Sequence, residues 1–144
     1  MELVVGLATL REPGSQRFPG NAASTARVRA SMQLPAVIGA SVSVLAGLLG
    51  LIWPQQVSKV IGLNLPGPLG VSEFRATYGG LFIGAGGAVL VLGSADAALV
   101  LGAAWLGAFV ARVVSMVVDR NVSKENLAGC AIELAVGGLL VLGR

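Results

Sequence analysis

The sequence predicts an all-α protein that crosses a lipid bilayer four times as an antiparallel helix bundle, preceded by an N-terminal extension. Two observations predict this fold. Of the 144 residues, 55% are hydrophobic and only 12% are charged, which is about half the charged share of a typical soluble domain. Four stretches are also apolar over the length of about 20 residues that a membrane-spanning helix needs. Their unbroken apolar character differs from the alternation expected of barrel strands.

Residues 1–31 form the predicted extension, and their composition predicts a disordered or weakly structured segment. The first ten residues, MELVVGLATL, have a short apolar stretch and no basic start, so they are not typical of a secretory signal. Residues 11–31 are rich in Arg, Ser, Pro and Gly. Met32 stands directly before the first long apolar stretch, so the working protein could begin there; a targeting extension is the alternative. The transmembrane domain is assigned to residues 32–144.

The four predicted helices cover about residues 34–53, 71–93, 96–118 and 126–142. The first carries no charge and ends at Trp53 and Pro54, an interfacial aromatic residue followed by a helix breaker. The second is charged only near its start. The third and the fourth each contain one internal charge, Arg112 and Glu133 respectively.

The connections between these helices carry turn and capping signals. Residues 54–70 contain three prolines and predict an interfacial loop, with a short amphipathic turn at 56–63. Ser94 or Asp96 can cap the third helix, and Ser123 can cap the fourth. Because the last two connections are short, the second, third and fourth helices should run antiparallel as neighbours.

Small residues recur at four-residue spacing in the helices, as in Gly39, Ser43 and Gly47, or in Gly80 and Gly84. Lipid gives helices no hydrophobic drive to associate, so close backbone approach supplies much of the packing energy. The spacing predicts helix contacts within the chain; contact with a partner subunit or a second copy is the alternative.

The charged residues within the spans predict a polar cluster, because a charge at the centre of a span is costly and is kept away from lipid. Counting about 1.5 Å per residue from the loops, Arg75, Arg112 and Glu133 reach similar depths. Helical spacing adds neighbours to each of them. The candidate members are Arg75, Tyr78, Arg112, Ser115 and Glu133, with Glu73, Asp119 and Asn126 as secondary members.

Two interpretations of this cluster stay open. In the first, Glu133 pairs with Arg112 or with Arg75 in an ion pair that fixes the helix register. Alternatively, the side chains line a polar pocket for a headgroup, a small substrate or a proton.

The sequence Glu73-Phe-Arg75-Ala-Thr-Tyr78-Gly79-Gly80, followed by Gly84, resembles a family of small four-helix bacterial integral membrane proteins of unknown function (DUF4345-like). The segment Ala111-Arg112-Val-Val-Ser115, Asp119 and the lone Glu133 are similar to the same pattern. The resemblance covers about residues 34–144. It implies the fold and a place in the bacterial inner membrane, but no activity.

Composition favours a non-enzymatic accessory or lipid-contacting protein. The chain has no His and one Cys, Cys130, which argues against zinc, haem and His-dependent catalysis, and no cofactor is expected. The basic residues are scattered, so nucleic acid is not an expected partner. The expected partners are the lipid bilayer and a second copy or a larger membrane complex. The alternatives are a small enzyme acting on a lipid or isoprenoid, with Glu133 as acid or base, and a dimeric carrier.

Overall fold

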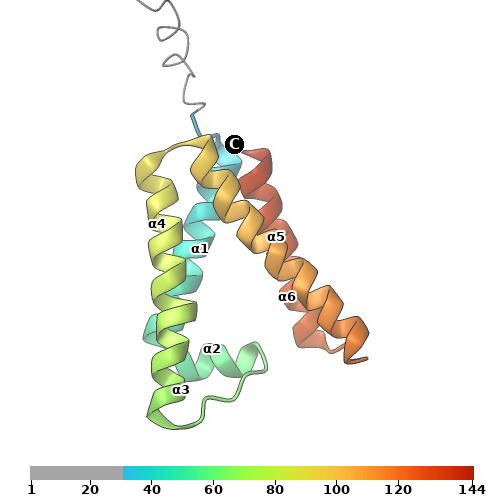
Figure 1. Cartoon of the computed structure of the whole chain (residues 1–144). Helices are drawn as coiled ribbons and strands as arrows, with labels where there is room; N and C mark the ends of the chain where they lie inside the picture. The colour runs from blue at the N-terminus through green and yellow to red at the C-terminus, as the bar shows by residue number, and fades with distance from the viewer. Residues whose placement is uncertain (1–30) are drawn as a thin grey trace, which may run out of the picture.

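The computed structural model describes residues 31–144 and is helical throughout this part, apart from its turns (Figure 1). Four helical stretches are long and apolar enough to span a membrane, which confirms the predicted fold class. They are α1 (Leu34–Ile52), the continuous stretch α3 (Gly67–Phe74), η1 (Arg75–Leu81) and α4 (Phe82–Leu92), then α5 (Ala95–Val118) and α6 (Lys124–Leu142). Apart from Ser31, the predicted extension lies outside the described residues.

The caps of the last two spans follow the sequence signals. The hydroxyl oxygen of Ser94 accepts a hydrogen bond from the backbone N–H of Ala97 at 3.2 Å. Ser123 accepts one from the N–H of Asn126, also at 3.2 Å. Gly93 ends α4 with a left-handed φ of 57°, a conformation that favours glycine. The bond to Ala97 shows that Ser94, and not Asp96, is the N-cap of α5.

The second span begins four residues earlier than predicted, at Gly67. Pro68 lies in the first turn of α3, where a proline costs no helical hydrogen bond. The predicted turn at 56–63 is a short helix, α2 (Pro54–Val60), with another proline at its start. Both differences have the same cause: the prolines begin helices here, whereas the sequence analysis took them as loop residues. Inside the span, η1 is a π-helical segment.

Helix α1 is the element that joins the two halves of the molecule. It packs against η1 and α4 on one side and against α6 on the other, while α5 packs mainly on α6. Figure 1 shows α4 and α5 meeting at their hairpin and diverging towards the other end. Adjacent antiparallel order is as predicted, but α4 and α5 are neighbours only near their shared turn.

Glycines on α1 allow this close packing. A Cβ on Gly47 would lie 2.8 Å from the carbonyl oxygen of Gly79, and one on Gly50 would lie 2.6 Å from that of Tyr78. The small-residue spacing predicted contacts inside the chain, and these positions make such contacts.

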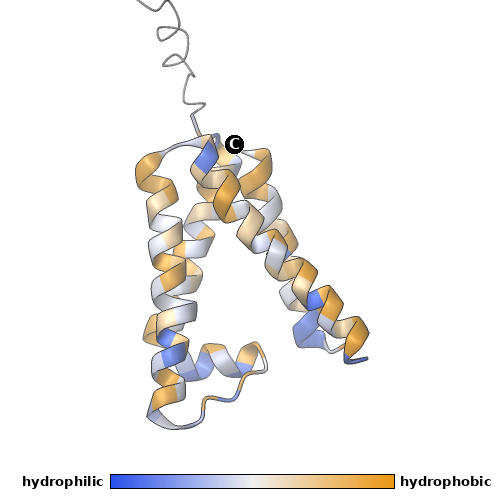
Figure 2. Ribbon diagram, viewed as in Figure 1, coloured by the Kyte–Doolittle hydropathy of each residue, from blue (hydrophilic) through white to orange (hydrophobic). Residues whose placement is uncertain are grey.

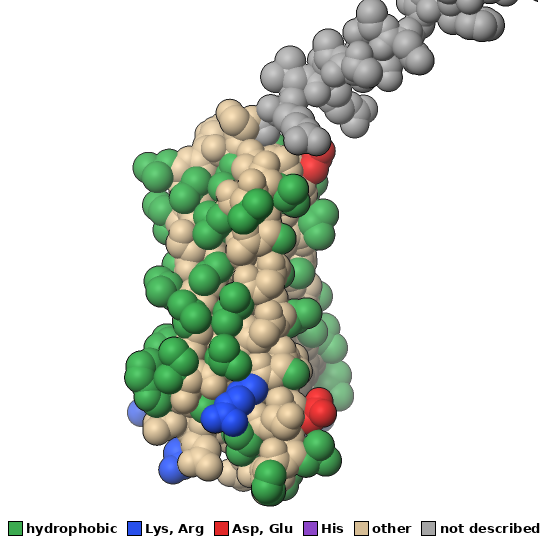
Figure 3. All heavy atoms as spheres, turned by 90° about the vertical axis from the view of Figure 1, so that its left-hand side faces the viewer, with side chains coloured by type: hydrophobic (Ala, Val, Ile, Leu, Met, Phe, Trp, Pro, Cys, Tyr) green, Lys and Arg blue, Asp and Glu red, His purple; other side chains and the backbone are tan. Residues whose placement is uncertain are grey.

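The buried apolar core lies where the helices converge, and includes Ala36, Ala40, Val89 and Leu140. Outside this core, large hydrophobic side chains on every span are exposed. Figure 2 shows polar residues near the two ends of the molecule and apolar ones between them. The face seen in Figure 3 has basic and acidic side chains only towards its ends. This distribution is that of a membrane protein whose apolar surface meets lipid.

Candidate functional site

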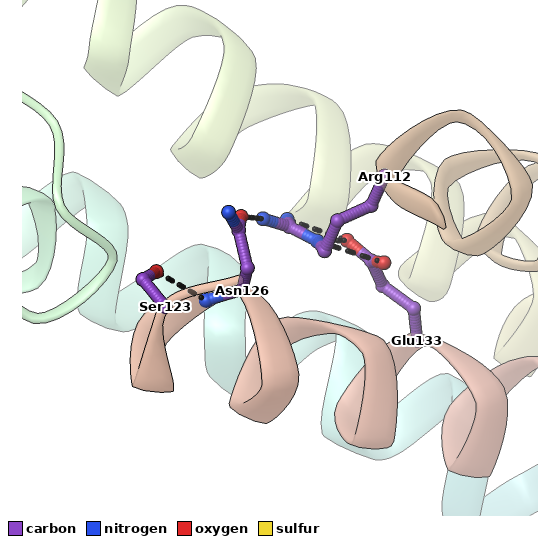
Figure 4. A network of polar contacts seen from close by, with 4 residues as sticks. All are labelled: Arg112, Ser123, Asn126 and Glu133. Atoms are coloured by element: carbon purple, nitrogen blue, oxygen red, sulfur yellow. Dashed lines mark hydrogen bonds and ion pairs between the residues drawn. The ribbon is translucent and has the colours of Figure 1, made fainter. Parts of the chain in front are cut away.

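An ion pair between α5 and α6 is the main polar feature inside the spans (Figure 4). Arg112 Nη2 lies 2.7 Å from Glu133 Oε1, and Arg112 Nε donates to both carboxylate oxygens at 3.0 Å. Arg112 therefore binds Glu133 through two neighbouring nitrogens, Nε and Nη2, which is the bidentate geometry typical of a guanidinium and a carboxylate. Of the two pairings that the sequence left open, the structure contains the one with Arg112.

Asn126 extends this pair towards the start of α6. Its side-chain oxygen accepts a hydrogen bond from Arg112 Nη1 at 3.2 Å, and its amide nitrogen donates to the carbonyl of Asn121 at 3.1 Å. The backbone N–H of Asn126 is held by Ser123. We call Arg112, Asn126 and Glu133 the Arg112 network; it connects the pair to the turn before α6.

Burial is uneven within the Arg112 network. Glu133 lies at the midpoint of α6 and its side chain is 8% exposed, whereas that of Arg112 is 31% exposed. Arg112 lies six residues from the end of α5, about 9 Å along the helix axis. The carboxylate is thus deep in its span, and the guanidinium reaches it from a level nearer the connecting turn.

Gly129 is part of the site, although it was not among the predicted site residues. A Cβ there would lie 2.7 Å from both Cζ and Nε of Arg112. The guanidinium therefore lies directly over the backbone of α6. The sequence spacing could have indicated this position, because Gly129 lies between Asn126 and Glu133 on the same face of the helix.

Ser115 and Asp119 form a separate, exposed pair on α5. The Ser115 hydroxyl donates to Asp119 Oδ2 at 2.7 Å. The predicted spacing of four residues accounts for this bond. Neither side chain is hydrogen-bonded to the Arg112 network within residues 31–144.

Arg75 and Tyr78 lie on the other side of α1 from α6, so the structure does not gather all five predicted residues. Arg75 Nε donates to the carbonyl of Leu51 at 3.1 Å, near the end of α1. Similar depth did not bring Arg75 to Glu133, because η1, which begins at Arg75, packs on α1 rather than on α5 or α6. Glu73 is exposed on α3.

Tyr78 belongs to a row of aromatic rings along this span. Its ring stacks on Phe74 with centroids 4.6 Å apart and faces Phe82 at 6.2 Å. The ring centroids of Phe82 and of Trp105, which lies on α5, are 5.0 Å apart. Trp105 Nε1 in turn donates to Ser43 Oγ at 2.9 Å. The row ties α4 and α5 to α1 near the core, which is the packing role that an aromatic residue most often has.

The chemistry open to the Arg112 network follows from its bonds. Both carboxylate oxygens of Glu133 already accept hydrogen bonds from Arg112. A guanidinium has five N–H groups, so Arg112 keeps donors beyond those it uses. The network is therefore suited to holding two helices together. No group of three or more His, Cys, Asp or Glu side chains in the described part of the chain could hold a metal ion.

The comparisons with known proteins give a family and nothing finer. The model of a family described as a domain of unknown function (DUF4345) matches residues 31–143. No curated protein and no solved structure matches the chain.

Proposed function

The chain belongs to the DUF4345 family, whose function is unknown, and for this member we propose a non-enzymatic accessory role in a bacterial inner membrane, in contact with lipid. In this proposal the Arg112 network is a clasp that fixes α5 against α6. The bacterial location rests on the resemblance around Arg75 and Tyr78. The pairing of Glu133 with Arg112 is the observation that carries the non-enzymatic part.

The pairing favours a clasp over a catalytic carboxylate for a chemical reason. A general base needs a carboxylate oxygen free to reach the proton that it abstracts. In Glu133 both oxygens accept from Arg112, and the side chain is almost fully buried. A charge left alone in a span costs about 2.5–3.5 kcal/mol on insertion scales. The pair therefore allows both charges to remain inside the membrane.

A double-mutant cycle tests the clasp. We expect Glu133→Gln and Arg112→Gln each to lower the free energy of unfolding by about 2–3 kcal/mol, because each leaves one charge without its partner. The double variant should lose clearly less than the sum of the two, because no charge is left alone. Unfolding of the purified chain from mild into denaturing detergent gives these free energies.

Glu73→Gln is the matched control, since it removes an exposed carboxylate from another span. It should change the free energy of unfolding by less than about 0.5 kcal/mol. Additive losses in the cycle, or a Glu133→Gln variant as stable as the unaltered chain, would show that the pair is not a clasp.

The accessory role predicts a stable partner in the membrane. After extraction of the full chain from its native membrane in mild detergent, we expect a complex heavier than one chain in its detergent micelle. Mass spectrometry of the complex would identify either a second copy or another subunit. A protein recovered only as a single chain at every detergent concentration would contradict the accessory role.

A further inference from the structure

A hollow beside Arg75 lies apart from the Arg112 network. It has a volume of about 450 Å³ and is lined by Gln55, Leu65, Gly67, Pro68, Val71 and Arg75. It is open to the outside and lies where α2, the following loop and α3 meet, at the end of the molecule that carries Trp53. Trp at the end of a span is typical of the membrane–water interface.

Arg75 brings a positive charge to this hollow without a compensating carboxylate. Its Nε is used by the carbonyl of Leu51, while Nη1 and Nη2 make no hydrogen bond within residues 31–144. The ion pair between Arg112 and Glu133 is the one that the structure contains over the same residues. Arg75 is thus anchored through one nitrogen, and its two terminal nitrogens remain available to an anion.

The rest of the lining has two kinds of surface. Gln55 supplies an amide that can donate a hydrogen bond, and Leu65, Pro68 and Val71 supply apolar wall. Val60 on α2 and Leu69 on α3, the two helices that border the hollow, are also exposed. A ligand that suits both surfaces has an anionic group joined to an apolar body. Arg75 lies about 12 Å along the helix from Gly67, within reach of the interface for a long side chain.

We propose that this hollow binds the headgroup phosphate of an anionic phospholipid, with Arg75 and Gln55 on the phosphate and Leu65, Pro68 and Val71 against the start of the acyl chains. A guanidinium suits a phosphate because two of its N–H groups can bind two oxygens at once. The inference rests on the membrane placement of the four spans. It does not depend on the Arg112 clasp or on an accessory partner.

Lipid titration of the full chain in neutral detergent, followed by native mass spectrometry, tests the site. The probes are phosphatidylglycerol, phosphatidylcholine and inorganic phosphate. We expect one phosphatidylglycerol to bind per chain more tightly than phosphatidylcholine, and inorganic phosphate not to displace it. Arg75→Gln should weaken phosphatidylglycerol binding by about tenfold or more, because a charged hydrogen-bonding partner is lost.

Two further variants separate binding in the hollow from general electrostatic attraction to the protein. Lys59→Gln removes one positive charge from α2, which does not line the hollow at that residue, and should change binding by less than about twofold. Val71→Trp fills the hollow but keeps Arg75, so it should also weaken binding. Equal binding by Arg75→Gln, unaltered binding by Val71→Trp, or displacement by inorganic phosphate would overturn the proposal. The double-mutant cycle of Arg112 and Glu133 is unaffected by any of these results.

Discussion

At the scale of single residues, the sequence left Arg112 and Arg75 as alternative partners of Glu133, and the structure contains the pair with Arg112. Counting residues along a helix gives the depth of a side chain in the membrane, and by this count Arg112 and Arg75 are equally good partners for Glu133. Which way a side chain points around its helix depends on tertiary packing, and Arg75 reaches the carbonyl of Leu51 instead. Asn126 and Glu133 were predictable because both lie on one face of α6.

The close approach of the Arg112 side chain to Gly129 leads to a prediction about one substitution. Because a Cβ would meet Arg112 Cζ and Nε at 2.7 Å, Gly129→Ala should displace the guanidinium and lower the free energy of unfolding by about 1–2 kcal/mol. Gly138→Ala is the matched control on the same helix, where a Cβ would meet nothing within 4 Å. Detergent unfolding measures both. A loss for Gly129→Ala that persists unchanged in the Arg112→Gln background would contradict the account.

At the scale of elements, the apolar stretches predicted the four spans well because a bilayer imposes one simple length. The starts of α5 and α6 lie within two residues of the predicted starts, since Ser94 and Ser123 signal them directly. The start of the second span was missed because Gly67 and Pro68 suit a turn as well as a first helical turn. Nothing in the residue pattern signalled the π-helical segment η1.

The contact between α1 and η1 gives a prediction for these elements. Gly50→Ala would place a Cβ 2.6 Å from the carbonyl oxygen of Tyr78, and a backbone atom cannot yield as a flexible side chain can. We expect a loss of about 1–3 kcal/mol in the free energy of unfolding. Gly84→Ala, with open space around it, should be close to neutral. Equal stability of the two variants, measured by the same detergent unfolding, would refute the tight contact.

At the scale of the whole molecule, composition alone predicted a membrane protein, because so much apolar surface cannot be buried in a chain of this size. Composition could not predict that α1 packs against η1, α4 and α6 while α4 and α5 have few contacts with each other. This packing depends on which glycines face which helix, and the structure gives that answer at Gly47 and Gly50. As a result, the predicted cluster is divided between the Arg112 network and the Arg75 side of α1.

The central claim is that the chain crosses a bilayer four times, once with each of its four long apolar helical stretches. Single cysteines introduced in a Cys130→Ala background, and labelled with a membrane-impermeant maleimide in intact and in opened vesicles, test it most directly. We predict labelling of Ser94→Cys from one side and of Asn121→Cys from the other, with Ala108→Cys protected although that residue is exposed on the protein surface. Labelling of Ser94→Cys and Asn121→Cys from the same side, or ready labelling of Ala108→Cys, would contradict the account.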